Sequence, residues 1–259
     1  MKWDLHQAIE GCLRHGIGGI APWRDQLEAA GLDSVARHLR DAGLRVTGLC
    51  RGGMFPVGSK AAWQKVIDDN RRAVDEAVAL QADCLVLVTG GLPEGSRDLP
   101  GARSQVRDGI ATLLEYARPA AMPLAIEPLH PMYAADRACI NTMAQANDLC
   151  DELGDGVGIA VDVYHVWWDP TLEREIARAG RERILAFHLC DWLVPTTHLL
   201  LDRGMMGDGV IDIPLIRSWI ERAGYAGFYE VEIMSRDNWW ARPPDEVLAV
   251  IKERMATAV

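Results

Sequence analysis

The sequence predicts an α/β fold, a (β/α)8 barrel of the TIM type whose first strand is missing or displaced. Short apolar runs alternate with amphipathic helical patterns along the chain, as in parallel sheets covered by helices. The 259 residues match the usual size of one such barrel, so we expect a single domain over residues 1–259. No GxGxxG or GxxxxGK[ST] turn follows a strand, which disfavours the alternative, an open doubly wound sheet.

Seven nearly continuous apolar runs predict the strands, at residues 16–23, 45–51, 84–90, 123–128, 158–165, 184–191 and 227–233. The helical patterns lie at residues 4–15, 59–80, 103–118, 141–153, 171–179, 212–223 and 244–255. Asp169 before Pro170 predicts the start of one helix, and Asp212 before Pro214 predicts the start of the next.

The first strand of the barrel has no counterpart in the sequence, because the chain opens with the helical pattern of residues 4–15. The unfilled seam would expose strand edges near Ile20 and Val231. We therefore expect a dimer contact or a rearranged terminus to cover this seam.

Composition limits the kind of partner. The chain has 37 acidic and 27 basic residues, a net charge of −10, and no basic cluster longer than Arg71-Arg72. This balance disfavours a nucleic-acid or anionic-membrane surface and favours a small-molecule ligand. The six cysteines are scattered without a CxxC pair, which indicates a reducing cytoplasm, and no apolar stretch is long enough to span a membrane. We expect a soluble cytoplasmic homo-oligomer, a dimer or tetramer.

Four apolar runs each end in a residue that binds hard metals: Glu127 in LAIEP, Asp162 in IAVDVYH, His188 in LAFHL and Glu232 in YEVEI. Barrel enzymes place their chemistry at the C-terminal ends of the strands. A single acid at a strand end is more often a helix cap or part of an ion pair. Four residues of metal-binding type at one face of the barrel instead favour a divalent-metal site. Three carboxylates and one imidazole suit Mn²⁺ best, with Mg²⁺ or Co²⁺ possible.

Three further polar residues are candidates for substrate contact. His165, three residues after Asp162, is either a pocket residue or a core histidine. His130, in EPLHP, faces either substrate or solvent. Arg203, in DRGMMGDG, either reaches ligand oxygens or pairs with a neighbouring aspartate at the surface.

Aromatic residues also gather near strand ends, where they can form the wall of a sugar pocket or simply pack the loops. They are Trp23, Trp167, Trp168, Trp239 and Trp240. Arg51-Gly52-Gly53 either approaches a ligand closely or forms a plain turn.

Two acids near the predicted ligands have secondary assignments. Glu230 shares a strand face with Glu232, and we assign Glu230 a structural role. Asp191 could support His188 from outside the ligand set.

The order of these motifs resembles the sugar phosphate isomerase/epimerase superfamily, the xylose isomerase-like barrels, and is similar to the ketose 3-epimerases. The motifs are Glu127, Asp162-x-x-His165, His188, Arg203 with a GxG segment, and Glu232 after GYAG. The resemblance runs from about Asp4 to the C-terminus and departs from the family in the missing first strand. It implies that Glu127, Asp162, His188 and Glu232 bind the metal. It also implies that Glu127 and Glu232 transfer protons and that His165 and Arg203 contact substrate oxygens.

We therefore predict a metal-dependent isomerase or epimerase that acts on a sugar or polyol ketone through an enediolate. An inosose-type dehydratase on the same metal site, with His130 as an added acid, is one alternative. A non-catalytic sugar-binding protein is another. Hydride-shift isomerisation is less favoured because the later strand ends offer no lysine, and an endonuclease would need a basic groove.

Overall fold

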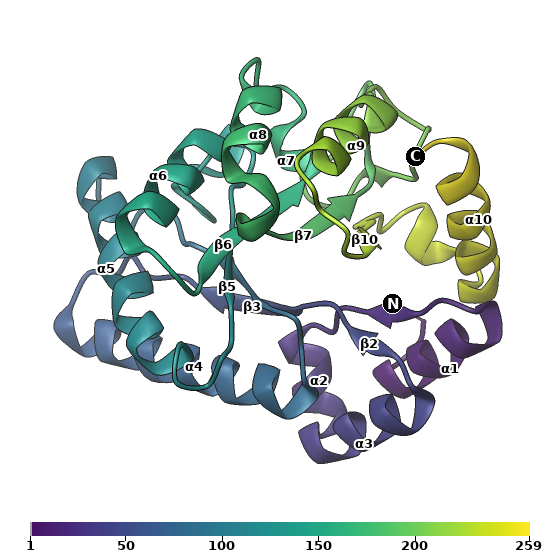
Figure 1. Cartoon of the computed structure of the whole chain (residues 1–259), viewed down its shortest axis with the longest axis horizontal. Helices are drawn as coiled ribbons and strands as arrows, with labels where there is room; N and C mark the ends of the chain where they lie inside the picture. Colours follow the sequence, from purple (N-terminus) through teal and green to yellow (C-terminus); the bar gives the residue numbers. More distant parts are fainter. Residues whose placement is uncertain (1) are drawn as a thin grey trace.

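The computed structural model describes residues 2–259 and shows a curled parallel sheet surrounded by helices, an α/β half-barrel (Figure 1). Six strands form its main sheet in the order β10-β7-β6-β5-β4-β3. Their bounds are β3 Leu49–Gly53, β4 Leu85–Val88, β5 Leu124–Glu127, β6 Val157–Asp162, β7 Ile184–Leu189 and β10 Tyr229–Val231. Two further parallel strands, β1 Gly19–Ile20 and β2 Arg45–Val46, pair with each other. The predicted parallel α/β architecture is confirmed.

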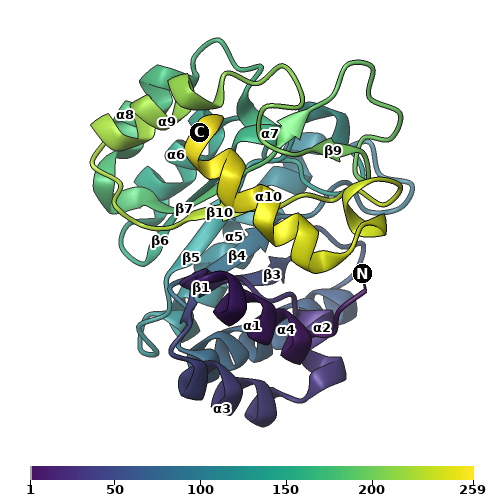
Figure 2. The same cartoon turned by 90° about the vertical axis from the view of Figure 1, so that its right-hand side faces the viewer.

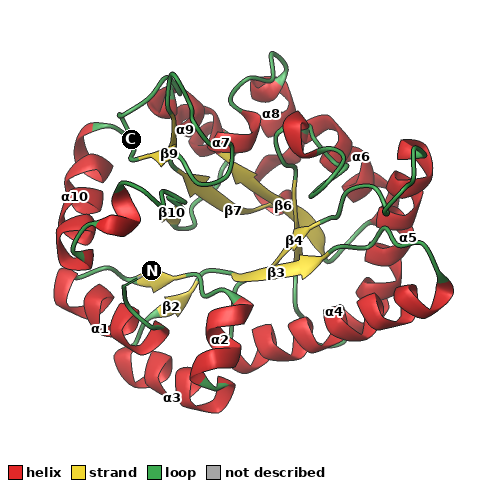
Figure 3. Cartoon of the chain, turned by 180° about the vertical axis from the view of Figure 1, so that it is seen from behind, coloured by secondary structure: helices red, strands yellow, loops and turns green. Residues whose placement is uncertain are grey.

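The helices cover the outside of the sheet, as Figure 3 shows from behind. They are α1 Leu5–His15, α2 Arg24–Ala30, α3 Leu32–Ala42, α4 Lys60–Leu80, α5 Leu99–Ala117, α6 Met143–Leu153, α7 Val163–Val166, α8 Leu172–Arg183, α9 Ile213–Arg222 and α10 Pro244–Thr257, with short 3-10 turns at Pro131–Tyr133 and Trp239–Ala241. Every residue of β4, β5 and β6 is buried, as expected for strands packed on both faces. No helix in residues 2–259 is long and apolar enough to cross a membrane.

Helix boundaries differ from the predictions where capping residues decide them. Helix α5 begins one turn earlier than residue 103, because the Asp98 side chain accepts from the Gly101 amide and Pro100 lies in the first turn. Helix α8 begins at Leu172 with Thr171 at the cap position, not at Asp169. Asp169 Oδ1 instead accepts from the amide and hydroxyl of Thr171 in a preceding turn. The prediction of Asp169 as the cap was wrong by two residues.

The predicted strands are all shorter in the structure, and helices α2, α3 and α7 were missed. The run at residues 45–51 divides into β2 and β3. The run at residues 158–165 ends at Asp162, whose Oδ1 accepts from the Tyr164 amide at 2.8 Å and so starts α7. Helices α2 and α3 fill the segment between β1 and β2, for which no helix was predicted.

At Gly53 the backbone of β3 passes very close to that of β4. The Gly53 φ of +105° lies in the region that favours glycine, and a Cβ there would approach the Val88 carbonyl oxygen to 2.0 Å. The buried Asn70 side chain accepts from the Gly53 amide at 2.6 Å and donates to the Gly53 carbonyl at 2.8 Å. The glycines after Arg51 therefore serve the packing of β3 against β4.

The strand layer is open at the predicted seam. Among the described strands, β1 pairs only with β2 and β10 pairs only with β7, so no ladder joins β1 to β10. The Phe228 ring lies beside Gly19, where a Cβ would come within 3.1 Å of two ring carbons. Figure 2 shows that α1 and α10 pack side by side. Asp245 of α10 pairs with Arg14 and His15 of α1 at 2.8 and 2.9 Å. The helical layer thus closes across the seam, and a dimer contact there stays a prediction.

Candidate metal centre

Four polar residues converge at the C-terminal ends of neighbouring strands. Glu127 and Asp162 end β5 and β6, His188 lies opposite Asp162 on β7, and Glu232 follows β10. One ligand atom from each of these four residues lies within 4.8 Å of the other three. Parallel strands end at one edge of the sheet, so the ladder itself brings the four together. The sequence predicted this convergence correctly.

The cluster is buried and strongly charged. Asp162 is fully buried, Glu127 and His188 are each 5% exposed, and the Glu232 side chain is 20% exposed. His188 Nδ1 lies 3.1 Å from Glu127 Oε1. Burial lowers the pKa of His188, but the carboxylates of Glu230, Glu127 and Glu232 outweigh it and raise the pKa to about 10. Burial also raises the pKa of Asp162, although Arg203 opposes this shift.

Arg203 supplies the positive charge that these carboxylates need. It lies on β9 (Arg203–Gly204), which pairs antiparallel with β8 (Asp191–Trp192), and it is 2% exposed. One guanidinium nitrogen donates to Asp162 Oδ2 at 3.0 Å and to Glu232 Oε2 at 2.9 Å. The guanidinium also lies 4.4 Å from the centroid of the Tyr164 ring. The alternative of a surface arginine paired with a neighbouring aspartate is therefore wrong.

His165 lies in the site, on α7 and not on a strand. It is 2% exposed, and its pKa is well below the usual value, because of burial and then the charge of Arg203. The His130 amide approaches His165 Nδ1 at 3.2 Å, and Arg203 approaches Nε2 at 3.1 Å. Both neighbours are hydrogen-bond donors, and a neutral imidazole accepts at only one nitrogen. One of the two donors is therefore left without an acceptor on His165.

An aromatic wall adjoins the cluster, built from His130, Tyr164, Trp167, Trp168 and Trp192. Trp192 stacks on His130 with ring centroids 4.9 Å apart and on Tyr164 at 4.7 Å. His130 also meets the edge of Trp168 at 5.9 Å, and burial lowers its pKa. Trp167 lies 5.9 Å from Trp192, and its buried indole N–H has no acceptor among the described residues. Of the two alternatives for His130, the structure supports a place in the wall of the site.

The remaining predicted aromatic residues do not join this wall. The Trp23 backbone forms an isolated bridge to Cys50 within β3, and among the described residues Trp23 makes no ring contact or hydrogen bond with the acidic cluster. Trp239 is buried against Arg242, 4.1 Å from its ring centroid. Sequence reasoning missed Tyr164 and Trp192, which sit next to His165 and Asp191 in the chain.

The sequence suggested that Asp191 could support His188, but the structure gives Asp191 a different role. Its two carboxylate oxygens accept from the amides of Gly207, Gly209 and Ile211 at 3.0, 2.8 and 3.0 Å. It therefore fixes the loop that follows Arg203. Outside the four clustered residues, an acid that lies near His188 is Glu230, whose Oε2 is 3.8 Å from His188 Nε2.

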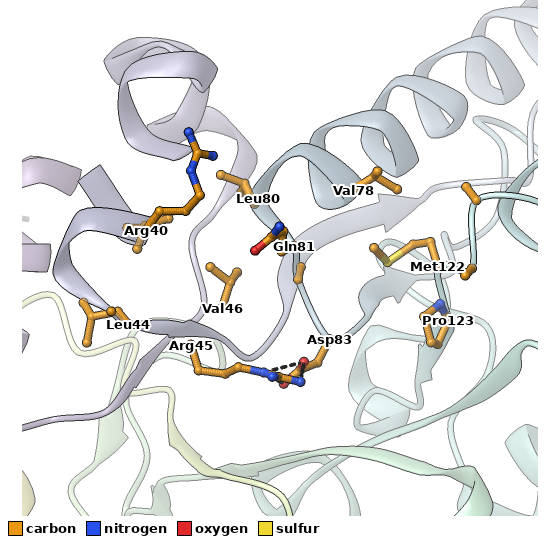
Figure 4. A pocket seen from close by; sticks show the side chains of 15 residues that line it. Arg40, Leu44, Arg45, Val46, Val78, Leu80, Gln81, Asp83, Met122 and Pro123 are labelled. Atoms are coloured by element: carbon orange, nitrogen blue, oxygen red, sulfur yellow. Dashed lines mark hydrogen bonds and ion pairs between the residues drawn. The ribbon is translucent and has the colours of Figure 1, made fainter. Parts of the chain in front are cut away.

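A depression opens at the end of the barrel where the strands begin, away from the four clustered residues (Figure 4). Most of its lining is apolar or backbone, and Arg45 pairs with Asp83 across it. No group of metal-binding side chains converges there among the described residues. Among the described residues, the side chains that could hold a metal ion are those of the acidic cluster of Glu127, Asp162, His188 and Glu232.

The four donors fit a divalent cation. Their mutual spacing of at most 4.8 Å suits ligands that surround one ion at about 2.0–2.3 Å each. Three carboxylates and one imidazole form an oxygen-rich set, and no thiolate is among them. Glu127, Asp162, His188 and Glu232 together could therefore hold a metal ion.

Comparisons with known proteins agree with the fold. A family model described as the xylose isomerase-like TIM barrel matches residues 9–254, whereas no curated protein matches. The solved structure of protein SMc04130 from Sinorhizobium meliloti 1021 is 60% identical and has a TM-score of 0.98, with 99% of this chain and 94% of that chain covered.

Two more distant structures show the same fold. The IOLI protein with a bound zinc atom is 19% identical, with a TM-score of 0.85 and 99% of this chain and 93% of that chain covered. The 3-keto-D-glucoside 4-epimerase YcjR from E. coli is also 19% identical, with a TM-score of 0.75 and 96% and 94% covered. The family match over nearly the whole chain decides the assignment: this chain belongs to the xylose isomerase-like TIM-barrel family.

Proposed function

We propose that this protein is a divalent-metal-dependent sugar isomerase or epimerase that moves a proton through an enediolate between Glu127 and Glu232. The observation behind this proposal is the convergence of both glutamates with Asp162 and His188 within 4.8 Å, at the strand ends of a barrel from this family. Epimerases among its structural neighbours support the reaction class. We take Mn²⁺ as the first metal to test, with Mg²⁺ and Co²⁺ next.

The two glutamates approach the site from different strands. Glu127 ends β5 and Glu232 follows β10, with β6 and β7 between them in the sheet. A substrate carbon between the two carboxylates could lose a proton to one and regain it from the other, as epimerisation requires. A divalent cation, when bound, would polarise the neighbouring carbonyl and stabilise the enediolate charge.

Substrate oxygens have two donors available. Within residues 2–259 the buried Arg203 Nε has no partner, and one of the two donors that face His165 lacks an acceptor there. A carbonyl or hydroxyl oxygen of the substrate could accept from them. The wall of Trp192, Trp167 and Tyr164 suits the apolar C–H faces of a sugar or polyol ketone.

The dehydratase alternative needs an added acid, and His130 is poorly suited to that task. Its Nδ1 accepts from the Met132 amide at 3.2 Å, and burial lowers its pKa, so its protonated form is disfavoured. The structure therefore gives more support to epimerisation than to loss of a hydroxyl. The acidic chain, with a net charge of −10, also supports a small uncharged substrate.

Deuterium exchange tests this proposal. The Mn²⁺-loaded protein is incubated in D₂O with a panel of ketoses, keto-sugars and inososes, and NMR follows each C–H next to a carbonyl. We expect wash-in at one such carbon, lost in both Glu127→Gln and Glu232→Gln. Glu152→Gln, an exposed change on α6, is the control and should exchange normally. Full exchange in both site variants would refute the assignment of the proton-transfer pair.

A further inference from the structure

We infer that Glu230 is a positioning residue, which holds the imidazole of His188 so that Nδ1 faces the metal. This inference rests on the proposed metal site and assigns a specific task to an acid outside the ligand set. It replaces the structural role that the sequence suggested for Glu230.

The β10–β7 ladder places the two residues directly opposite each other. Glu230 pairs in register with His188, and side chains opposite each other across a ladder share one face of the sheet. His188 Nδ1 lies 3.1 Å from Glu127 Oε1, whereas Nε2 lies 3.8 Å from Glu230 Oε2. The imidazole therefore lies between two carboxylates, and Nδ1 is the nitrogen on the side of the ligand cluster.

The position of the proton on a histidine ligand explains why this arrangement matters. A neutral imidazole that binds a cation through Nδ1 carries its proton on Nε2, and that N–H needs an acceptor in a buried site. Glu230 Oε2 is the carboxylate oxygen on that side. Their 3.8 Å separation is an ion-pair distance, and a shift of about 0.8 Å would bring it to hydrogen-bond length.

Glu230 has little else to compensate its burial. Its side chain is 11% exposed. Burial raises the pKa of Glu230, and the charge of His188 and then the nearby Thr47 hydroxyl oppose this shift, although among the described residues that hydroxyl has no partner in full hydrogen-bond geometry. A buried carboxylate without a strong partner is costly, so the N–H of His188 would be a favourable partner for it.

A purely mechanical role is the competing explanation. Strand β10 borders the open seam, and Thr47, just after β2, lies on the other side of it. Glu230 could simply brace β10 against this segment. A brace would affect thermal stability, whereas a positioning role acts on metal affinity and on the tautomer of His188.

The test measures Zn²⁺ binding by the full chain, because Zn²⁺ is diamagnetic and allows NMR of the same complex. Competition with a chelator gives the affinities of wild type, Glu230→Gln and Glu230→Ala. Loss of a partner that orients a metal-binding histidine typically costs about 10–100-fold in affinity, and we expect this for Glu230→Ala. Glu230→Gln keeps an acceptor oxygen at the same place and should lose less. Glu152→Gln should bind like wild type.

Two further readouts separate positioning from bracing. In the wild-type Zn²⁺ complex, ¹⁵N NMR should show His188 protonated at Nε2 alone, and Glu230→Ala should mix the tautomers. In a His188→Ala background, Glu230→Ala should cause no further loss of affinity.

The experiment distinguishes a failure of the positioning role from a failure of the proposed metal site. Unchanged affinity in Glu230→Ala, or an equal loss with and without His188, would overturn the positioning role while the metal site stands. A wild-type protein that binds no Zn²⁺, Mn²⁺ or Co²⁺ would overturn the proposed site itself, and the positioning role with it.

Discussion

Replacing Arg203 by methionine should strongly destabilise the metal-free protein. The guanidinium is 2% exposed and donates to Asp162 at 3.0 Å and to Glu232 at 2.9 Å. Methionine keeps most of the side-chain volume but removes the charge. It leaves Asp162, which is fully buried, without the cation that donates a hydrogen bond to its Oδ2. Loss of one partner of a buried pair typically costs about 3–5 kcal/mol, because the other charge stays desolvated.

The expected loss of stability in Arg203→Met depends on how deeply each carboxylate is buried. We count the Asp162 pair in full and add nothing for Glu232, whose side chain is 20% exposed. For a chain of this size each kcal/mol lowers the midpoint by about 2–4 °C, so Arg203→Met should melt about 6–20 °C below wild type. A divalent cation brings positive charge to the same carboxylates. Saturating metal should therefore raise the melting temperature of the variant more than that of wild type.

Thermal unfolding in EDTA and in saturating Mn²⁺ measures both effects. The control is Arg222→Met, whose ion pair with Glu173 is exposed on both sides. Exposed pairs contribute about 1 kcal/mol or less, so this control should melt at most about 4 °C below wild type. If Arg203→Met melts no lower than the control in EDTA, the account of Arg203 as the counter-charge of Asp162 is wrong.

Three other predictions follow from the same contacts. Since His188 has a pKa raised to about 10 without metal and must be neutral to bind it, metal affinity should rise with pH between 7 and 9, by up to about tenfold per unit. Calorimetry in buffers of different ionisation enthalpy should detect one released proton, and a pH-independent affinity would contradict this. Once deuterium exchange identifies a substrate, His130→Ala should raise the KM for that substrate, whereas His130→Phe, which keeps a ring against Trp192, should leave the KM unchanged. Equal effects of the two substitutions would exclude stacking as the contribution of His130. Gly53→Ala should destabilise more than Gly31→Ala in urea unfolding, because both have positive φ but only at Gly53 would the new Cβ meet backbone; equal losses would contradict the clash.

The strand ends carried most of the functional information in the sequence. Each of Glu127, Asp162 and His188 ends a run that is buried on both faces, so a parallel fold had to bring them to one edge. That argument needs only periodicity and strand direction. It could not place His165, because Asp162 both ends its strand and caps the helix that begins one residue later.

Contacts between side chains that are far apart in the sequence were harder to predict. The sequence placed Asp191 near His188 because the two are close in the chain, yet its carboxylate turns to the amides of Gly207 and Gly209. Trp192 contacts His130 across 62 residues of chain through a hairpin too short to show an apolar period. Helices α2 and α3 were missed between two of the predicted strands, where no strong capping signal marks their starts.

Because the sheet is open at the seam, metal binding should also stabilise strand β10. Glu232 follows β10, whose outer edge pairs with no strand in the described part of the chain, whereas Glu127 and Asp162 belong to strands paired on both sides. A cation shared by these residues would tie β10 to β5 and β6 as well as to β7. Its binding free energy would then add directly to the stability of the least supported strand, at about 2.7 kcal/mol for a metal at 100 times its Kd. Hydrogen exchange of the amides in β10 should slow on metal addition more than that of the amides in β5, because β5 is already held by ladders on both sides. Equal protection of the two strands would show that β10 is as well supported without metal as the interior of the sheet.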